Sequence, residues 1–380
     1  MESRRRILLV GAALAAAALG LSGFRDHTSR PEAAAPPPAA HDPVRLPAPP
    51  PAARRGGRPP QFVVVSFDGS GGSRLWTYWR SVARRAGAHF TFFVSGVYLL
   101  DWSRRTLYRP PRHEPGSSDI GFALESEGGP LAMLRQIAAA YGEGDEIGTH
   151  YNGHFCAPYR GSVGEWTAAD WASELSQFDE LLFRANRFEL PFGPAEVVGG
   201  RTPCLQGDLS VLYPVLARLG FRYDASRQGP LGTWPRRIAG IWSVPLLEIP
   251  FVGHTFRVVS MDYNLLANQV EESPARVERE TYASLLGAFR ASYRGGRAPL
   301  SIGFHFETWD SWAYDHALTR FLVRVCGLRD VRCTSIRELV DWLDSRRGTP
   351  VSAARGKNVR VAATWTGPGA RRLARSARGA

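Results

Sequence analysis

The stretch Phe62-Val63-Val64-Val65-Ser66-Phe67, followed at once by Asp68, decides the fold of this chain. A run of apolar, mostly β-branched residues is typical of a buried strand, and here a polar residue follows it directly. Three other runs end in the same way: Glu196 to Gly200 before Arg201, Gly220 to Tyr223 before Asp224, and Leu300 to Phe304 before His305. Groups at the carboxyl ends of parallel strands converge on one mouth of a barrel, so these four are expected to form one site.

Two histidines, His150 and His154, lie four residues apart just after a short β-like run. Imidazoles at this spacing can hold one divalent metal ion and turn a bound water into a nucleophile. The spacing alone is weak evidence, because such pairs also arise by chance in a chain with 9 histidines. The four strand endings strengthen the interpretation. They predict a cluster of polar residues at the barrel mouth, and the two histidines would be part of this cluster.

The middle of the chain predicts an α/β fold. The chain has 380 residues, 44% of them hydrophobic, which is enough for one sizeable core. Strand-like runs alternate with amphipathic, helix-like segments, and this order favours βαβ units with a parallel sheet closed into a barrel. The expected strands cover 61–67, 89–95, 145–149, 197–201, 220–224, 245–251 and 299–306. The expected helices cover 74–86, 129–141, 167–187, 208–219, 275–293, 312–326 and 335–345.

The two ends of the chain differ in composition from the middle. Residues 1–23 combine a basic start with an apolar run and predict a signal peptide or signal anchor. Residues 24–60, rich in Pro, Ala and Arg, predict an extended linker, and residues 347–380 predict a basic disordered tail. The formal net charge is +12, without a recognition motif for nucleic acid. We therefore expect a secreted or extracytoplasmic protein whose termini meet a membrane or an anionic wall polymer.

Four cysteines in an exported chain predict two disulfides. Cys326 and Cys333 bracket a short connection and are expected to pair locally. Cys156 and Cys204 then remain, one just after His154 and the other just after Arg201. Their bond would join two loops of the proposed mouth. Thiol catalysis is disfavoured, because neither cysteine stands beside an evident base.

Five short motifs follow one another along the chain. They read Ser66-Phe67-Asp68-Gly69, His150-Tyr151-Asn152-Gly153-His154, Arg201-Thr202-Pro203, Tyr223-Asp224-Ala225-Ser226 and Phe304-His305-Phe306. In order and spacing they resemble the motifs of the polysaccharide deacetylases of carbohydrate esterase family 4, especially the chitin-deacetylase-like branch. The resemblance covers roughly residues 60–346. It implies a deformed (β/α) barrel of about seven parallel strands, with a single catalytic domain at residues 61–346.

The resemblance also implies roles for four residues of the expected mouth. Asp68 matches the general base that takes a proton from the attacking water. Arg201 matches an arginine that orients this base, and its charge would keep the carboxylate ionised. His305 matches the histidine that protonates the leaving amine. Asp224 matches an aspartate that tunes His305 or lines the mouth; a simple turn residue is an equally good interpretation.

A divalent metal ion is implied as well, zinc in the first place or else cobalt, nickel or manganese, with His150 and His154 as ligands. The family's carboxylate ligand, a second Asp in the first motif, is Gly69 here. Two protein ligands bind a divalent ion less well than three. Either Asp68 itself turns to the metal, or another residue replaces the missing ligand, or the site binds no metal. The candidates for replacement are Asp145, Asp262, Glu307 and, through a water, Ser70.

Three functions remain open at this stage. The first is an exported metal-dependent deacetylase, expected to be monomeric, that removes N-acetyl groups from amino sugars of chitin-like or cell-wall glycans such as peptidoglycan. The second is a weak or inactive domain that binds cell-wall glycan. The third is a hydrolase of a non-sugar amide or an ester, since a fold does not fix a substrate. Trp309, Trp312 and Tyr314 are expected either to stack on a sugar ring or to pack the start of a helix.

Overall fold

Strand β1 (Gln61–Gly69) is buried along its whole length except at its last residue. Its alternate side chains enter two different apolar clusters. Val63, Val65 and Phe67 belong to one cluster, and Phe62 and Val64 belong to the other. A strand covered on both faces has no solvent side, which explains the uninterrupted apolar run in the sequence.

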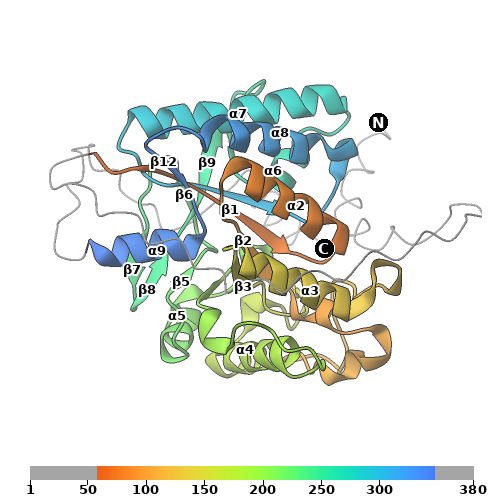
Figure 1. Ribbon diagram of the computed structural model, residues 1–380. Helices are drawn as coiled ribbons and strands as arrows, with labels where there is room; N and C mark the ends of the chain where they lie inside the picture. The colour runs from red at the N-terminus through yellow and green to blue at the C-terminus, as the bar shows by residue number, and fades with distance from the viewer. Residues whose placement is uncertain (1–57, 347–380) are drawn as a thin grey trace, which may run out of the picture. The chain divides into compact units, whose positions relative to one another are not determined.

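The computed structural model describes residues 58–346, and their main sheet is curled and mostly parallel (Figure 1). Besides β1 it contains β2 (Thr91–Val94), β3 (Glu146–Thr149), β4 (Gly199–Gly200), β5 (Tyr223–Asp224), β7 (Arg236–Ile238), β8 (Ile241–Ser243), β11 (Leu300–His305) and β12 (Val331–Cys333). The order is β11-β1-β2-β3-β4-β5-β8-β7, with β12 paired to β1. All pairs from β11 to β8 are parallel, and β7 is antiparallel to β8.

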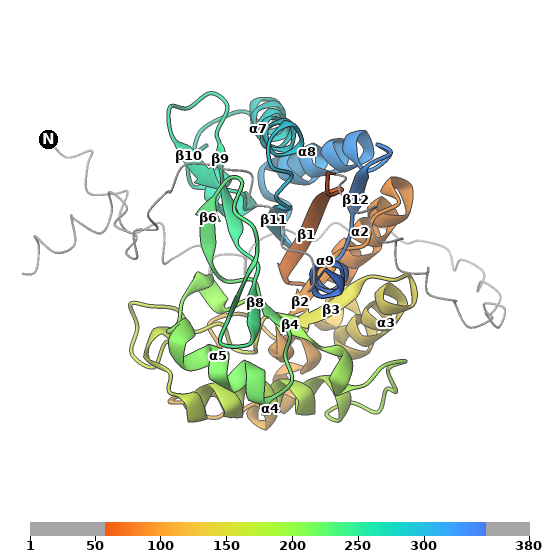
Figure 2. The same cartoon turned by 90° about the vertical axis from the view of Figure 1, so that its left-hand side faces the viewer.

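A smaller sheet stands beside β11. It consists of β6 (Gln228–Pro230), β9 (Leu246–Pro250) and β10 (Arg257–Val259), in the order β10-β9-β6 (Figure 2). An isolated parallel bridge pairs Met261 with Gly303 of β11, and the Gly303 amide donates to the Ser260 carbonyl at 2.9 Å. The main sheet is therefore a half-barrel, and the smaller sheet lines its β11 edge.

Helices connect and cover the strands. They are α2 (Ser73–Ala86), α3 (Gly129–Gly142), α4 (Ala168–Phe183), α5 (Leu209–Arg218), α6 (Asp262–Leu266), α7 (Pro274–Arg294), α8 (Trp309–Val325) and α9 (Ile336–Ser345). The described residues also contain short 3-10 helices at Gly96–Leu99, Trp102–Leu107, Glu125–Glu127, Val163–Glu165, Pro194–Glu196 and Pro203–Leu205. Helices α7 and α8 pack side by side, and α2 contacts both α8 and α3 (Figure 1).

The predicted α/β fold, a single deformed barrel, is confirmed. Each of the seven expected strands and seven expected helices is present. The structure adds β6, β7, β8, β10, β12 and α6, which have three to five residues each. Segments of this length are too short to show a hydrophobic period, which is why the sequence did not predict them.

The terminal predictions concern parts of the chain that the structure does not describe. The signal segment at 1–23, residues 24–57 of the linker and the tail at 347–380 all lie outside the described residues. Within residues 58–346, none of the helices combines the length and the apolar character needed to span a bilayer.

Candidate active site at the carboxyl edge of the sheet

The polar residues that end the strands lie along one edge of the half-barrel. Asp68 of β1 is in register with His305 of β11. His150 directly follows β3, Arg201 directly follows β4, and Asp224 is the last residue of β5. Because β11, β1, β2, β3, β4 and β5 are consecutive and parallel, the carboxyl ends that carry these residues lie on the same side of the sheet.

Asp68 and Arg201 form a buried ion pair. The Arg201 Nη1 donates to Asp68 Oδ1 at 2.7 Å, and the two side chains are 0% and 3% exposed. Arg201 Nε donates to the Ala225 carbonyl, and the guanidinium lies 4.9 Å from the Phe93 ring centroid. Burial alone would raise the pKa of Asp68, but the positive charge and hydrogen bond of Arg201 outweigh it and hold that pKa below its usual value. The carboxylate is therefore ionised near neutral pH.

His305 is held by a carboxylate that the sequence analysis had considered only as a metal ligand. Asp262 Oδ1 lies 2.7 Å from His305 Nδ1, and Asp262 Oδ2 accepts the His305 backbone N–H at 2.8 Å. Burial alone would lower the pKa of His305, but the negative charges of Asp262 and Asp68 offset this, so that pKa lies above its usual value. Because Asp262 holds Nδ1, Nε2 is the ring nitrogen of His305 that is left to transfer a proton. The His305 side chain is 27% exposed.

The expectation that Asp224 tunes His305 requires a correction, because Asp262 is the carboxylate that contacts this histidine. Asp224 accepts hydrogen bonds from the Tyr213 hydroxyl and from the backbone N–H and hydroxyl of Ser226. The Ser226 Oγ accepts in turn from the Thr202 backbone N–H at 2.8 Å. Asp224 thus fixes the turn after β5 to the loop that begins at Arg201, and its effect on the site is indirect.

His150 and His154 are brought together by a strained loop after β3. Their ring centroids are 5.1 Å apart, and both Tyr151 and His154 have φ of 60°, which is uncommon for residues other than glycine. His150 Nδ1 lies 2.8 Å from the Arg201 carbonyl, so it carries the proton and leaves Nε2 as the free nitrogen. Burial lowers the pKa of His150, and burial together with His150 lowers that of His154 to about 3. Both rings are therefore neutral, as metal ligands must be.

The third ligand of a metal centre is missing from this arrangement. Residues 58–346 contain two groups of three His, Cys, Asp or Glu side chains whose ligating atoms all lie within 4.8 Å of one another. Neither group contains Asp68 or His150. One of them, His154 with Cys156 and Cys204, uses both cysteines in a disulfide. The residues present thus supply two suitable imidazoles and do not fit a three-ligand centre.

The proposed replacements do not complete the centre. Asp145 precedes β3 and accepts from the Phe90 backbone N–H at 2.7 Å, so it lies at the amino end of the sheet. Both oxygens of Asp262 are bonded to His305. Glu307 is exposed and belongs to neither three-residue group. The Ser70 hydroxyl is bonded to the Phe67 carbonyl.

Both predicted disulfides are present. Cys156–Cys204 spans 48 residues and Cys326–Cys333 spans 7. The first joins the segment just after His154 to the segment just after Arg201, as the sequence analysis expected. It therefore ties together two loops that carry residues of the candidate site.

The aromatic residues after His305 have different surroundings. The Trp309 ring is 5.6 Å from the His305 ring, and Tyr263, which is 51% exposed, completes a group of three rings. Trp312 packs on Tyr78 instead, and Tyr314 is buried. Of the three aromatic residues considered for a sugar ring, Trp309 is the one beside His305.

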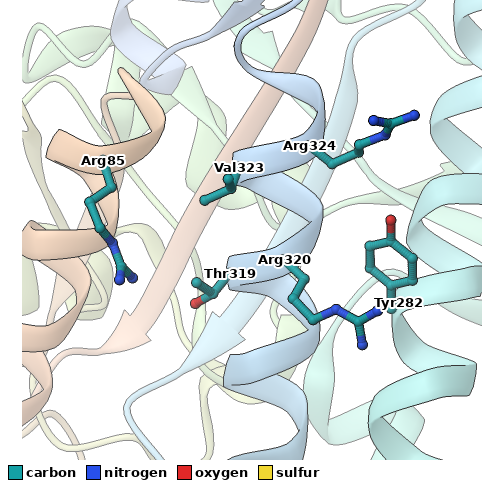
Figure 3. A pocket seen from close by; sticks show the side chains of 6 residues that line it. All are labelled: Arg85, Tyr282, Thr319, Arg320, Val323 and Arg324. Carbon is teal, nitrogen blue, oxygen red and sulfur yellow. The ribbon is translucent and has the colours of Figure 1, made fainter.

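A separate hollow of about 630 Å³ lies between α2, α7 and α8 (Figure 3). Its lining is rich in arginine, with one aromatic and one hydroxyl side chain. The lining residues are Arg85, Tyr282, Thr319, Arg320, Val323 and Arg324. None of the residues at the carboxyl edge contributes to it, so this hollow is not the candidate active site.

The half-barrel is a fold that the chain shares with solved structures of the polysaccharide deacetylase class. A candidate polysaccharide deacetylase from Mycobacterium smegmatis is 15% identical, with a TM-score of 0.50 over 81% of this chain and 98% of that one. A CE4 esterase from Streptococcus mutans is 11% identical, with a TM-score of 0.42 over 72% and 86% of the two chains. A CE4 family pseudoenzyme from Bacillus anthracis is 11% identical, with a TM-score of 0.40 over 74% and 66%.

No protein-family model matches the chain, and no curated protein matches it either. At this low identity, the likeness to the Mycobacterium smegmatis structure bears on the fold alone. The chemistry must be argued from the residues of the chain itself.

Proposed function

We propose that the chain is a hydrolase of the polysaccharide-deacetylase type that removes N-acetyl groups from amino sugars of chitin-like or cell-wall glycans. One observation carries the proposal. Asp68 and His305 stand side by side in register, and their surroundings move their pKa values in opposite directions. A carboxylate whose pKa is lowered beside a histidine whose pKa is raised is the base-and-acid pair that an amide hydrolysis needs.

The chain's own residues account for the proton transfers. Asp68 takes one proton from the water that attacks the acetyl carbon, and Arg201 keeps it oriented and charged. His305, held by Asp262, gives one proton to the amide nitrogen as the carbon–nitrogen bond breaks. The products are acetic acid and the free amine, and the cycle closes when Asp68 releases its proton to solvent and His305 takes one up from solvent.

The proposal includes residues that would hold a metal ion, but no reaction step that depends on one. His150 and His154 are neutral and close together, so they are the residues that would hold a divalent ion such as zinc. Because three ligands are not gathered, we assign no step of the reaction to a metal. This gap supports a second candidate function, a glycan-binding domain with little or no turnover.

The setting of the site in the chain is also part of the proposal. The segment at 1–23 would export the protein or anchor it, the linker at 24–60 would hold the domain at 61–346 away from the surface, and the basic tail at 347–380 would meet an anionic wall polymer. The two disulfides support an oxidising, extracytoplasmic compartment. We propose a monomer that acts on its glycan alone.

A substrate panel tests the proposed function. The purified full chain should release acetate from N-acetylated chitooligosaccharides or from peptidoglycan fragments, and release should be measured with added zinc, with added cobalt and with chelator. Saturable glycan binding without acetate under any of these conditions would favour the second candidate function. Release confined to acetyl esters or to non-sugar amides would show that amino sugars are not the substrates.

The replacement Asp262→Asn should narrow the pH range of activity. Activity requires protonated His305, so the alkaline limb of the profile follows the raised pKa of this histidine. Removing the Asp262 charge lowers that pKa, and the alkaline limb should move to lower pH while the acid limb stays in place. The check is kcat/KM measured against pH, with Asn264→Ala on the same helix as the control. An unchanged alkaline limb would show that His305 is not the acid.

A further inference from the structure

We propose that His254, Glu272 and Glu280 form a second, separate binding site for a divalent first-row transition metal such as Zn²⁺. Their ligating atoms all lie within 4.8 Å of one another. The residues come from three places: the loop between β9 and β10, the turn before α7, and α7 itself. None of them belongs to the carboxyl edge, and the inference does not depend on the proposed function.

The spacing of these atoms suits an ion between them better than a direct contact. His254 Nε2 lies 3.8 Å from Glu280 Oε2, which is too far for a hydrogen bond. Two ligands that each stand 2.0–2.2 Å from a tetrahedral zinc ion are about 3.4 Å apart. A small closure of the loop would therefore bring both atoms into coordination distance of one ion.

Two of the three ligating side chains have a buried atom that makes no hydrogen bond. Among the described residues, His254 Nε2 and Glu272 Oε2 are buried and accept or donate no hydrogen bond. A buried polar atom that makes no hydrogen bond is destabilising. A bound cation would satisfy both atoms at once.

The imidazole is already oriented for this role. The His254 ring stacks on Phe251, with centroids 4.0 Å apart and an angle of 15°, and Phe256 packs against it at 5.2 Å. Gly253 has φ of +88°, and a Cβ there would lie 2.7 Å from Glu280 Oε1. The glycine thus lets the loop approach the carboxylate closely, which brings His254 to Glu280.

Two neighbouring side chains, Arg276 and Gln269, also contact the carboxylates. Arg276 Nε lies 2.7 Å from Glu280 Oε1 and 3.4 Å from Glu272 Oε2, whereas the Glu280 oxygen nearest His254 Nε2 is Oε2. Gln269 Nε2 donates to Glu280 Oε2 at 3.1 Å. Two carboxylates and one guanidinium carry a net charge of −1 beside the imidazole. Binding would require Arg276, which is 49% exposed, to give up its longer contact.

The donor set points to the class of metal. An imidazole nitrogen with two carboxylates suits zinc, cobalt or manganese, whereas calcium and magnesium prefer all-oxygen sites. The ion would fasten the loop between β9 and β10 to α7. Gln269 extends this link to α8, because Gln269 Oε1 accepts a hydrogen bond at 3.2 Å from the hydroxyl of Tyr314, a residue of α8. The site is therefore expected to be structural.

Metal titration of the full chain tests the proposal. In a His150→Ala/His154→Ala background, which removes the imidazoles of the candidate active site, we expect one equivalent of Zn²⁺ by elemental analysis after dialysis and a higher Tm with Zn²⁺ than with chelator. His254→Ala should weaken Zn²⁺ binding at least about tenfold by calorimetry, since one of three ligands is lost. Co²⁺ absorption should change in the same way.

Two further variants keep the test decisive. Glu280→Gln is nearly isosteric and should also abolish the Zn²⁺-dependent rise in Tm, even if His254→Ala folds poorly. Glu278→Gln lies on the same helix, where Glu278 pairs with Arg320, and should leave Zn²⁺ binding unchanged. Zn²⁺ binding that survives both His254→Ala and Glu280→Gln would overturn the proposal, and so would a background protein that binds no Zn²⁺.

Discussion

Replacing Asp68 by asparagine should reduce acetate release by about 10²–10⁴-fold, because the base that accepts the proton of the attacking water is lost. The same change should destabilise the domain by about 3–5 kcal/mol, since it leaves the guanidinium of Arg201 buried without its counter-charge. Arg201 is completely buried, and its Nη2 already lacks a hydrogen-bond partner among the described residues. The measurements are acetate release at saturating substrate and urea unfolding followed by circular dichroism.

Two other variants separate catalysis from stability. Asp145→Asn changes a carboxylate that is equally buried but lies at the amino end of the sheet, where burial raises its pKa to about 7. This variant should retain activity. His305→Gln changes a partly exposed side chain and should lose activity with little loss of stability. A folded Asp68→Asn protein with the acetate release of the wild type would remove Asp68 from the mechanism.

The replacement Gly69→Asp should tighten the binding of Zn²⁺ or Co²⁺ at His150 and His154 by at least about tenfold. The change adds a carboxylate to two neutral imidazoles, and a third ligand is what the site lacks. Space is available, because a Cβ at residue 69 would meet its nearest neighbour, Tyr98 Cε2, at an ordinary 3.7 Å. The φ of +79° costs about 1–2 kcal/mol for a residue with a side chain, although Asp adopts such conformations more readily than most residues.

Gly69→Ala is the matched control, because it carries the same backbone strain without the carboxylate. Calorimetric titration should be carried out with His254→Ala in all proteins, so that the second proposed site does not contribute. Equal affinities of the Asp and Ala variants for both ions would mean that His150 and His154 are not metal ligands.

Some features of the site were predictable because they depend on local sequence. The strand endings at Asp68 and His305 follow long apolar runs, Arg201 follows a shorter one, and parallel strands bring such endings to one edge. The pairing of Cys156 with Cys204 followed from their positions just after two of the motifs. The seven longer helices were visible as amphipathic segments for the same reason.

The role of Asp262 was not predictable in this way. It follows a three-residue strand and begins a five-residue helix, so no periodic pattern marks it. It lies 43 residues from His305 along the chain, and only the packing of α6 against β11 joins them. The apolar run before Asp262 resembles the other strand endings, and this was the one available signal.

The sequence by itself therefore determined the α/β fold, the edge on which its polar residues gather and the two disulfides, because apolar periodicity and the spacing of residues along the chain express them directly. Only the tertiary structure decided that Asp262 holds His305, that Asp224 instead braces the Arg201 loop, and that His254, Glu272 and Glu280 meet. These contacts join residues from separate elements. Their geometry depends on how those elements pack, which local sequence patterns do not record.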